Sequence, residues 1–291
     1  MFCEVLSKAI RWYLRQVPVT EGKKQLLSLA MPLIVPMKNN QVTMMKHGFI
    51  MRLNLANKEH LHMWLYGTHD ERYEISMVEK LVREGDICWD IGANIGFYTL
   101  FLSKLAGPSG RVFSIEPAER TFQHLVENIS LNNVNNVKTL KLGIGDSDKE
   151  AVLYCNNPEF GEGTASLKFQ AGNSSEESVT IASIDNLITK EAMSKPDFIK
   201  IDVEGFQCEV FKGGVNYFTQ YAPLILAELK EKDREEMVIA EKLIRDMGFD
   251  IFEIYKNGLK PCLDITKSKK RNFILAKPGS ANYKKLSGHL L

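Results

Sequence analysis

Three acidic residues stand where apolar, strand-like runs of the sequence end. Asp90 closes "ICWD", Glu116 closes "VFSIE" and Asp146 closes "LGIGD". If these runs are parallel strands, their carboxyl ends meet at one edge of a sheet, which is where open α/β sheets bind ligands. Taken singly, Asp90 or Asp146 would serve as a helix cap or turn residue, and Glu116 would start a helix. Together they predict a ligand site.

A glycine turn follows the first of these acids. Gly92 and Gly96 let the backbone pass close to a ligand, and the helical pattern after Gly96 offers free amide hydrogens at its beginning. A dinucleotide fingerprint needs a further glycine at the middle position, which is Asn94 here. A side chain at that position intrudes on a pyrophosphate, and Asp90 repels phosphate. The turn therefore disfavours a dinucleotide.

S-adenosylmethionine suits these residues better, because it has an amino acid end, a sulfonium and a nucleoside. The ammonium group of its amino acid end would lie near Asp90. Glu116 lies 20 residues beyond Gly96, the position from which an acid accepts hydrogen bonds from ribose hydroxyls. Asp146 is placed to accept a hydrogen bond from the exocyclic amine of adenine.

The elements around these residues alternate between strand-like and helical patterns. From Ile87 the runs are "ICWDIG", "FYTLFLSKLA", "RVFSIEP", "AERTFQHLVENISLN" and "VKTLKLGIGD", and the alternation resumes with "DFIKIDVEG". Parallel strands need covering helices, and helices on both faces explain why the strands are apolar on both sides. We predict an α/β fold with a doubly wound, mostly parallel sheet.

Two further segments complete the predicted organisation. Residues 147–182 read as a hairpin and loop excursion, and "FDIFEIY" and "RNFILAKP" indicate an antiparallel pair at the end of the sheet. Residues 1–45 form a helical extension, and residues 46–291 form the main domain with its core at about 74–277. The helix near the N-terminus has its apolar residues on one face, which favours packing on its own domain.

Composition excludes several classes of protein. Charged residues make up 25% of the 291 residues and the net charge is +1, which is typical of a soluble globular chain and gives no sign of a nucleic-acid partner. The five cysteines show no metal-ligand spacing and indicate a reducing compartment. Charges interrupt the first apolar stretch, so we expect no signal peptide or membrane span and a cytoplasmic protein.

The sequence resembles the class I methyltransferases and, more narrowly, the FkbM family. The resemblance rests on the blocks "DICWDIGANIGFYTL", "RVFSIEPAERTFQHLVENISLNN", "LGIGDSDKEAVLY", "GTASL", "SVTIASIDNLI" and "DFIKIDVEGFQCEVFKGG", and it extends over about residues 66–277. It implies a Rossmann-like domain that uses S-adenosylmethionine to methylate hydroxyls, commonly of sugars, glycans or polyketide-type products.

The same resemblance implies roles for individual residues. The methionine end of the cofactor would be held by Asp90, Gly92, Asn94 and Gly96, the ribose by Glu116 and the adenine by Asp146. Glu74 matches a glutamate found upstream of the glycine turn and would border the methyl-transfer site.

Methyl transfer to a hydroxyl needs a base, because the acceptor loses its proton as it attacks the methyl carbon in line. The candidates are Asp202 and Glu204 in "KIDVEG", with Lys200 as a hydrogen-bond donor or tuner. The alternative is that Asp202 only orients the cofactor and Glu204 only caps the helix that follows.

Other candidates have weaker support. Glu228 and Asp202 are too few ligands to predict a divalent metal, which the sequence leaves open. The histidines of "HLHMWLYGTHD", His60, His62 and His69, are expected to pack or lie at the surface rather than act as a base. The basic stretch at 266–271 is expected to be a solvated loop, with contact to an acidic glycan or phospholipid as the alternative.

The expected function is O-methylation of a hydroxyl on a saccharide, glycan or secondary metabolite. The rival hypotheses are a nicotinamide-dependent oxidoreductase on a similar sheet and a non-catalytic binding module of the same fold. The sequence does not identify the acceptor or the oligomeric state.

Overall fold

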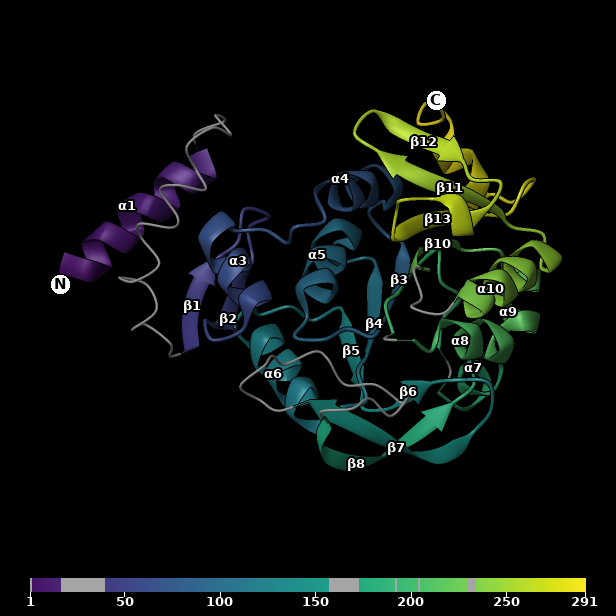
Figure 1. Ribbon diagram of the computed structural model, residues 1–291, viewed down its shortest axis with the longest axis horizontal. Helices are drawn as coiled ribbons and strands as arrows, with labels where there is room; N and C mark the ends of the chain where they lie inside the picture. The colour runs from purple at the N-terminus through teal and green to yellow at the C-terminus, as the bar shows by residue number, and fades with distance from the viewer. Residues whose placement is uncertain (1, 17–39, 157–172, 192, 204, 230–233) are drawn as a thin grey trace.

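The computed structural model of the chain describes residues 2–16, 40–156, 173–191, 193–203, 205–229 and 234–291. Within them a central sheet of eight strands organises the fold (Figure 1). Its strands are β3 (Ile87–Ile91), β4 (Arg111–Ile115), β5 (Val137–Leu140), β9 (Phe198–Ile201), β10 (Leu224–Glu228), β11 (Asp250–Tyr255), β12 (Gly258–Pro261) and β13 (Asn272–Ala276). They lie in the order β12-β11-β13-β10-β9-β3-β4-β5.

The pairing of these strands confirms the predicted mostly parallel sheet. β10, β9, β3, β4 and β5 pair in parallel, whereas β13 runs antiparallel to both β10 and β11. From β3 the chain proceeds outward to β4 and β5, then returns to the other side of β3 for β9 and β10. The order of the strands therefore reverses between β3 and β9, and such a reversal opens a crevice at the carboxyl ends of the strands.

Helices cover both faces of the sheet. One face packs against α4 (Arg72–Leu81) and α5 (Phe97–Ala106), and the other against α7 (Ile184–Glu191), α8 (Gln207–Gly213), α9 (Val215–Tyr221) and α10 (Arg234–Asp246). Because side chains alternate along a strand, Cys88 of β3 enters the first core while Trp89 and Ile91 enter the second. This double burial explains the unbroken apolar runs of the central strands.

The N-terminal part adds a second layer to the first face. It contains α1 (Phe2–Gln16), α3 (Lys58–Tyr66) and the antiparallel pair β1 (Asn40–Met44) and β2 (Ile50–Asn54). α1 packs on α3 and buries Ile10 and Leu14, so the predicted helix and its packing on the domain are observed. The β1–β2 pair extends across the predicted boundary at residue 45, and the division into two parts stays a prediction.

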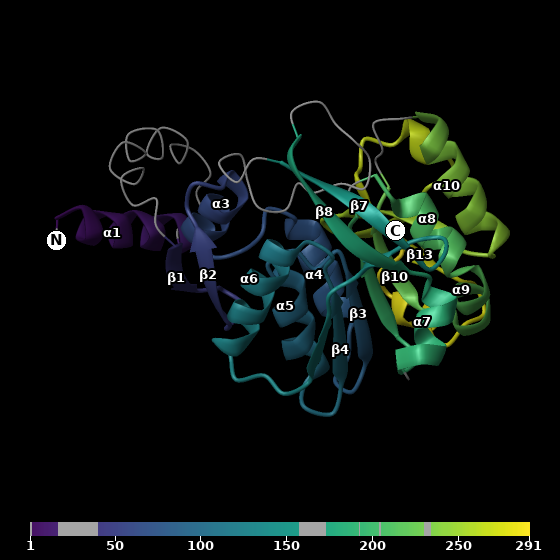
Figure 2. The same cartoon turned by 90° about the horizontal axis from the view of Figure 1, so that it is seen from below.

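A small separate sheet corrects one detail of the predicted topology. The run at 137–146 was expected to be one strand, but only β5 joins the central sheet, while β6 (Gly143–Ile144) pairs with β8 (Asn173–Ala182). β8 also pairs antiparallel with β7 (Lys149–Asn156), and seen from below this pair crosses in front of the central sheet (Figure 2). The middle of the predicted excursion, 157–172, lies outside the described residues and includes the "GTASL" block.

The remaining elements are α6 (Glu119–Ser130) and the short helices η2 (Ile265–Lys267) and η3 (Asn282–Leu286). None of the helices that the structure describes combines the length and the apolar character needed to cross a membrane.

Candidate active site

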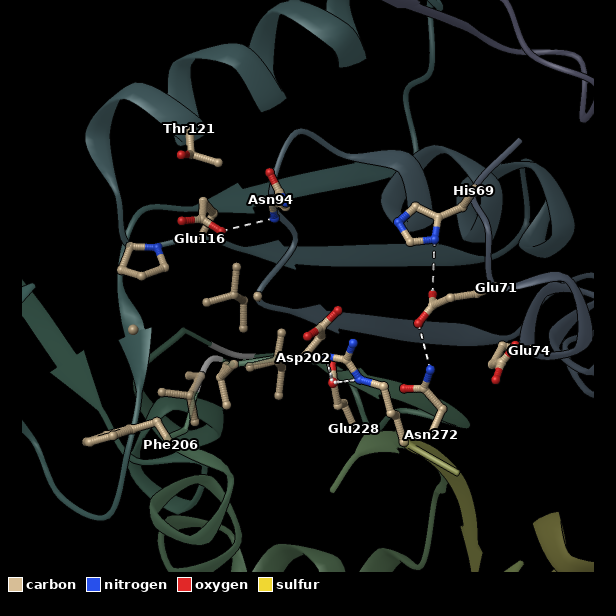
Figure 3. Close-up of a pocket in the computed structure, with 18 of the residues that line it drawn as sticks. His69, Glu71, Glu74, Asn94, Glu116, Thr121, Asp202, Phe206, Glu228 and Asn272 are labelled. Atoms are coloured by element: carbon tan, nitrogen blue, oxygen red, sulfur yellow. Dashed lines mark hydrogen bonds and ion pairs between the residues drawn. The ribbon is translucent and has the colours of Figure 1, made fainter. Parts of the chain in front are cut away.

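A cavity of about 430 Å³ opens where β3, β4, β9 and β10 end. Figure 3 shows two groups of side chains around it, with Asp202 and Glu228 between them. The glycine-turn end contains Asn94, Glu116, Thr121 and Phe206, and the acidic end contains His69, Glu71, Glu74 and Asn272. The cavity therefore lies at the reversal of strand order, as the sequence predicts for a ligand site.

The backbone of the glycine turn packs against the chain that follows β9. Gly92 has φ +79°, and a Cβ there would lie 1.9 Å from the carbonyl oxygen of Asp202. Gly96 also has a positive φ, of +93°, but a Cβ there would meet Leu125 of α6 at 2.7 Å. Gly92 lines the cavity, whereas Gly96 is outside its lining and packs against Leu125 of α6.

Glu116 holds the turn from the end of β4. One carboxylate oxygen accepts a hydrogen bond from the Asn94 backbone N–H at 3.0 Å, and the other accepts from the Ala118 N–H at 3.0 Å. Burial raises the pKa of Glu116 to about 7, although both backbone donors oppose the shift. The carboxylate lines the cavity and is 8% exposed, so it is available to a ligand hydroxyl but shielded from bulk water.

Asp90 lies beneath the cavity rather than in its wall. It is fully buried, accepts a hydrogen bond from the Thr99 hydroxyl at 2.7 Å and stands opposite Lys200 in the register of β3 and β9. Thr99 in turn contacts the hydroxyl of Ser114 at 2.7 Å. Burial raises the pKa of Asp90, against the effect of Lys200. The contact of Asp90 with the methionine end of the cofactor stays a prediction.

Asp146 was predicted to end the third strand of the central sheet, which is wrong. It follows β6 of the small sheet, its side chain is 39% exposed, and it pairs with Lys149 at 2.8 Å. The Lys149 hydrogen bond lowers the pKa of Asp146. The cavity is lined instead by Leu142, Gly143 and Ile144, which precede it, and a contact of Asp146 with adenine stays a prediction.

Four side chains form a row from below the cavity to its rim. The ammonium group of Lys200 donates to Asp202 at 2.7 Å, and Arg271 donates from Nε to Glu228 at 2.7 Å. Asp202 and Glu228 stand next to each other, each one residue beyond the Ile201–Ala227 pair of β9 and β10. Lys200 is buried, whereas Asp202, Glu228 and Arg271 line the cavity. In this row, two carboxylates therefore lie between two cations.

The charges in this row control one another. Burial disfavours the charge on Lys200, but Asp202, Glu71 and Asp90 outweigh it and raise the Lys200 pKa. Burial likewise opposes ionisation of Asp202, yet Lys200 holds the pKa of Asp202 below its ordinary value. Burial and the neighbouring Asp202 charge raise the pKa of Glu228 to about 7.

The acidic end contains a hydrogen-bonded group that sequence reasoning largely missed. Glu71 accepts from the Tyr98 hydroxyl and from the Asn272 amide, both at 2.7 Å. His69 Nδ1 lies 3.4 Å from Glu71 and 3.1 Å from Asp70. Burial opposes the charge on His69, but these two acids raise its pKa. His69 was expected to pack or lie at the surface, and it lines the cavity.

Of the other candidates predicted from the sequence, some line the cavity and some do not. Glu74 lines the cavity, and burial raises its pKa. His60 is buried against the Asn54 backbone, and His62 stacks near Tyr66, both outside the cavity lining. Glu204 lies outside the described residues. The cavity also reaches the end of the basic stretch, Lys269, Lys270 and Arg271, so these residues are not simply solvated.

No group of three or more His, Cys, Asp or Glu side chains in the described parts of the chain is arranged to hold a metal ion.

Comparisons with known proteins identify the domain that contains the cavity. The family model of the methyltransferase FkbM domain matches residues 90–251, from Asp90 to the start of β11. The chain is 31% identical over 174 residues to the hexuronic acid methyltransferase AglP of Haloferax volcanii, covering 58% of this chain and 66% of that protein. It is 26% identical over 192 residues to the methyltransferase sdnD of Sordaria araneosa, covering 56% and 73%.

A solved structure is also similar. It is the methyltransferase FkbM from Methylobacillus flagellatus, with 14% identity, a TM-score of 0.44, and coverage of 74% of this chain and 52% of that one. The chain thus spans just under two thirds of the length of AglP and about half of this structure.

The fold and the matched domain define a class I methyltransferase domain with a Rossmann-like sheet. The chain belongs to the methyltransferase FkbM domain family. This membership confirms the predicted family and the predicted cofactor, S-adenosylmethionine, and it argues against a nicotinamide-dependent oxidoreductase.

Proposed function

We propose that this protein is an S-adenosylmethionine-dependent O-methyltransferase that acts on a hydroxyl of a saccharide. The observation that carries the proposal is Glu116, a buried carboxylate that two backbone N–H groups hold at the edge of the cavity where β4 ends. A carboxylate at that place suits a ribose with two hydroxyl donors.

The residues present fit the cofactor at the glycine-turn end. Gly92 keeps the turn close to Asp202, Glu116 offers acceptors for the ribose, and Leu142, Ile144 and Phe206 offer apolar contacts for a base. The cavity volume of about 430 Å³ is within the range for small-molecule sites. When bound, S-adenosylmethionine supplies an electrophilic methyl group on a sulfonium.

The acidic end suits the acceptor. Carboxylates such as Glu71 and Glu74 can accept hydrogen bonds from the several hydroxyls of a sugar. Asp202 lies between the two ends of the cavity, where an acceptor hydroxyl would lose its proton. The curated relative named as a hexuronic acid methyltransferase supports a saccharide rather than another hydroxyl compound.

A methyl-transfer assay tests this function. The wild-type protein is incubated with trideuteromethyl-labelled S-adenosylmethionine and a panel of neutral pyranosides, uronic acids and hydroxylated metabolites, and products are identified by mass spectrometry. We expect the label on a hydroxyl oxygen of a saccharide, and no product from Glu116→Ala. Transfer only to carboxyl or amine groups, or only to the metabolites, would contradict the proposal.

A further inference from the structure

Asp202 and Glu228 form a pair of carboxylates that the proposed function does not by itself explain. They come from the ends of the neighbouring strands β9 and β10 at adjacent positions, one residue beyond the Ile201–Ala227 pair, and both line the cavity. Two carboxylates side by side cannot both ionise without cost, so a proton shared between them stabilises the pair.

Cations flank the pair on both sides. Lys200 contacts Asp202 from beneath the sheet edge, and Arg271 forms an ion pair with Glu228 from the rim of the cavity. Two cations beside two carboxylates permit loss of the shared proton near neutral pH, because the fully ionised row carries no net charge. The pair can therefore exist with or without its proton.

We propose that Asp202 and Glu228 share one proton and together receive the proton that the acceptor hydroxyl loses during methyl transfer, which makes Glu228 a catalytic residue. This inference rests on the proposed function. The acceptor oxygen forms its bond to the methyl carbon, the bond from sulfur to that carbon breaks with its electron pair on sulfur, and the hydroxyl proton enters the ionised pair. The proton then leaves to solvent, which restores the pair.

The surrounding charges favour Glu228 over Asp202 as the group that receives the proton. Lys200 keeps Asp202 a weak base, whereas burial and Asp202 bring the pKa of Glu228 to about 7, a value suited to a base near neutral pH. The other charged groups that face the pair or line the same cavity are Glu59, His69, Asp70, Glu71, Glu74, Glu116, Lys269, Lys270 and, below the sheet edge, Asp90. Arg271 lies nearest to Glu228 among the cations of the cavity wall.

Carbon-13 NMR of protein labelled at the glutamate carboxyl carbons tests the shared proton without any acceptor. The resonance that Glu228→Gln removes should titrate with a midpoint of about 7. Asp202→Asn should lower this midpoint, because the like charge is lost, and Arg271→Gln should raise it. A midpoint at the ordinary glutamate value in the wild-type protein, or no response to Asp202→Asn, would overturn the inference.

Turnover of the saccharide found in the panel assay tests the catalytic step. At saturating S-adenosylmethionine, wild-type turnover should rise with pH to a plateau above the Glu228 pKa of about 7. Glu228→Gln should lower turnover by about 100-fold or more and remove this rise, with cofactor affinity unchanged. The matched control is Glu127→Gln on the exposed face of α6, which should behave as wild type.

Two results would overturn the catalytic role. One is full turnover of Glu228→Gln, and the other is loss of wild-type turnover on chelation with recovery on adding Mg²⁺, which would make the pair a cation site. Failure of the proposed function looks different, because the wild-type protein itself would then transfer no methyl group to a saccharide hydroxyl.

Discussion

Glu116 both holds the backbone of the glycine turn and presents an ionisable carboxylate to the cavity. The same carboxylate that receives the Asn94 and Ala118 N–H groups faces the cavity, and its pKa is raised to about 7 by burial. Ribose hydroxyls donate hydrogen bonds best to an ionised carboxylate. Cofactor binding and deprotonation of Glu116 are therefore linked.

This linkage predicts the pH dependence of affinity for S-adenosylhomocysteine. Below the Glu116 pKa of about 7 the free protein binds a proton that the ligand must displace, so affinity should fall as the pH drops and protons should be released on binding. Calorimetry in two buffers with different ionisation heats measures both effects. Glu116→Gln should remove them, whereas Glu119→Gln, at a half-exposed glutamate outside the cavity lining, should not. Proton release that persists in Glu116→Gln would contradict the assignment.

A second prediction concerns the bare backbone of Gly92. Gly92→Ala and Gly279→Ala both place a side chain at positive φ, near +80°, but only the first brings a Cβ against Asp202, since Gly279 has nothing within 4 Å. Gly279→Ala should lower the free energy of unfolding by about 1–2 kcal/mol. Gly92→Ala should lower the free energy of unfolding by about 1–3 kcal/mol more than Gly279→Ala does, because of overpacking. Urea denaturation measures both losses. Equal losses would show that the close approach to Asp202 is unimportant.

The residues that could be predicted from the sequence are those that a short stretch of sequence is enough to place. Glu116, Gly92 and Asp202 follow apolar runs and could be placed at strand ends from that pattern alone. The contact of Asp202 with Glu228 depends on the pairing of β9 with β10, which no local pattern records. Glu71 lies three residues before Glu74, and this helical spacing was a signal that could have drawn attention to it.

At the level of elements, the reversal between β3 and β9 creates the cavity, and the alternation of patterns predicted the strands on both sides of it. The run at 137–146 was wrongly predicted to be one strand of the central sheet. Periodicity identifies a strand, but it does not identify the sheet in which that strand pairs. β12 was missed for a related reason, since its edge position leaves Lys260 and Pro261 exposed and weakens the apolar signal.

A prediction at this level concerns the contact between α1 and α3. The guanidinium of Arg15 donates to the carbonyls of Met44, Trp64 and Leu65, which includes the carboxyl-terminal turn of α3. Arg15→Ala should lower the free energy of unfolding by about 1–2 kcal/mol and speed amide hydrogen exchange in α3. Trp12→Ala, on the same helix with Trp12 64% exposed, is the control. If both variants behave alike, the carbonyl contacts do not hold α1.

At the scale of the whole molecule, the fold joins two different environments in one cavity. The glycine-turn end comes from β3, β4 and the chain before β6, and the acidic end comes from the segments around α4 and the start of β13. Asp202 and Glu228 lie at the junction, in line with a reaction between a methyl donor at one end and a hydroxyl acceptor at the other. The sequence alone could not bring Asn272 together with Glu71, because the two residues are 201 positions apart along the chain.

The most direct measurement is a crystal structure of the protein with S-adenosylhomocysteine bound. The ribose hydroxyls should lie within hydrogen-bond distance of the Glu116 carboxylate, with the sulfur directed toward Asp202 and Glu228. A nucleoside bound at the acidic end instead, or a ribose that makes no contact with Glu116, would contradict the account.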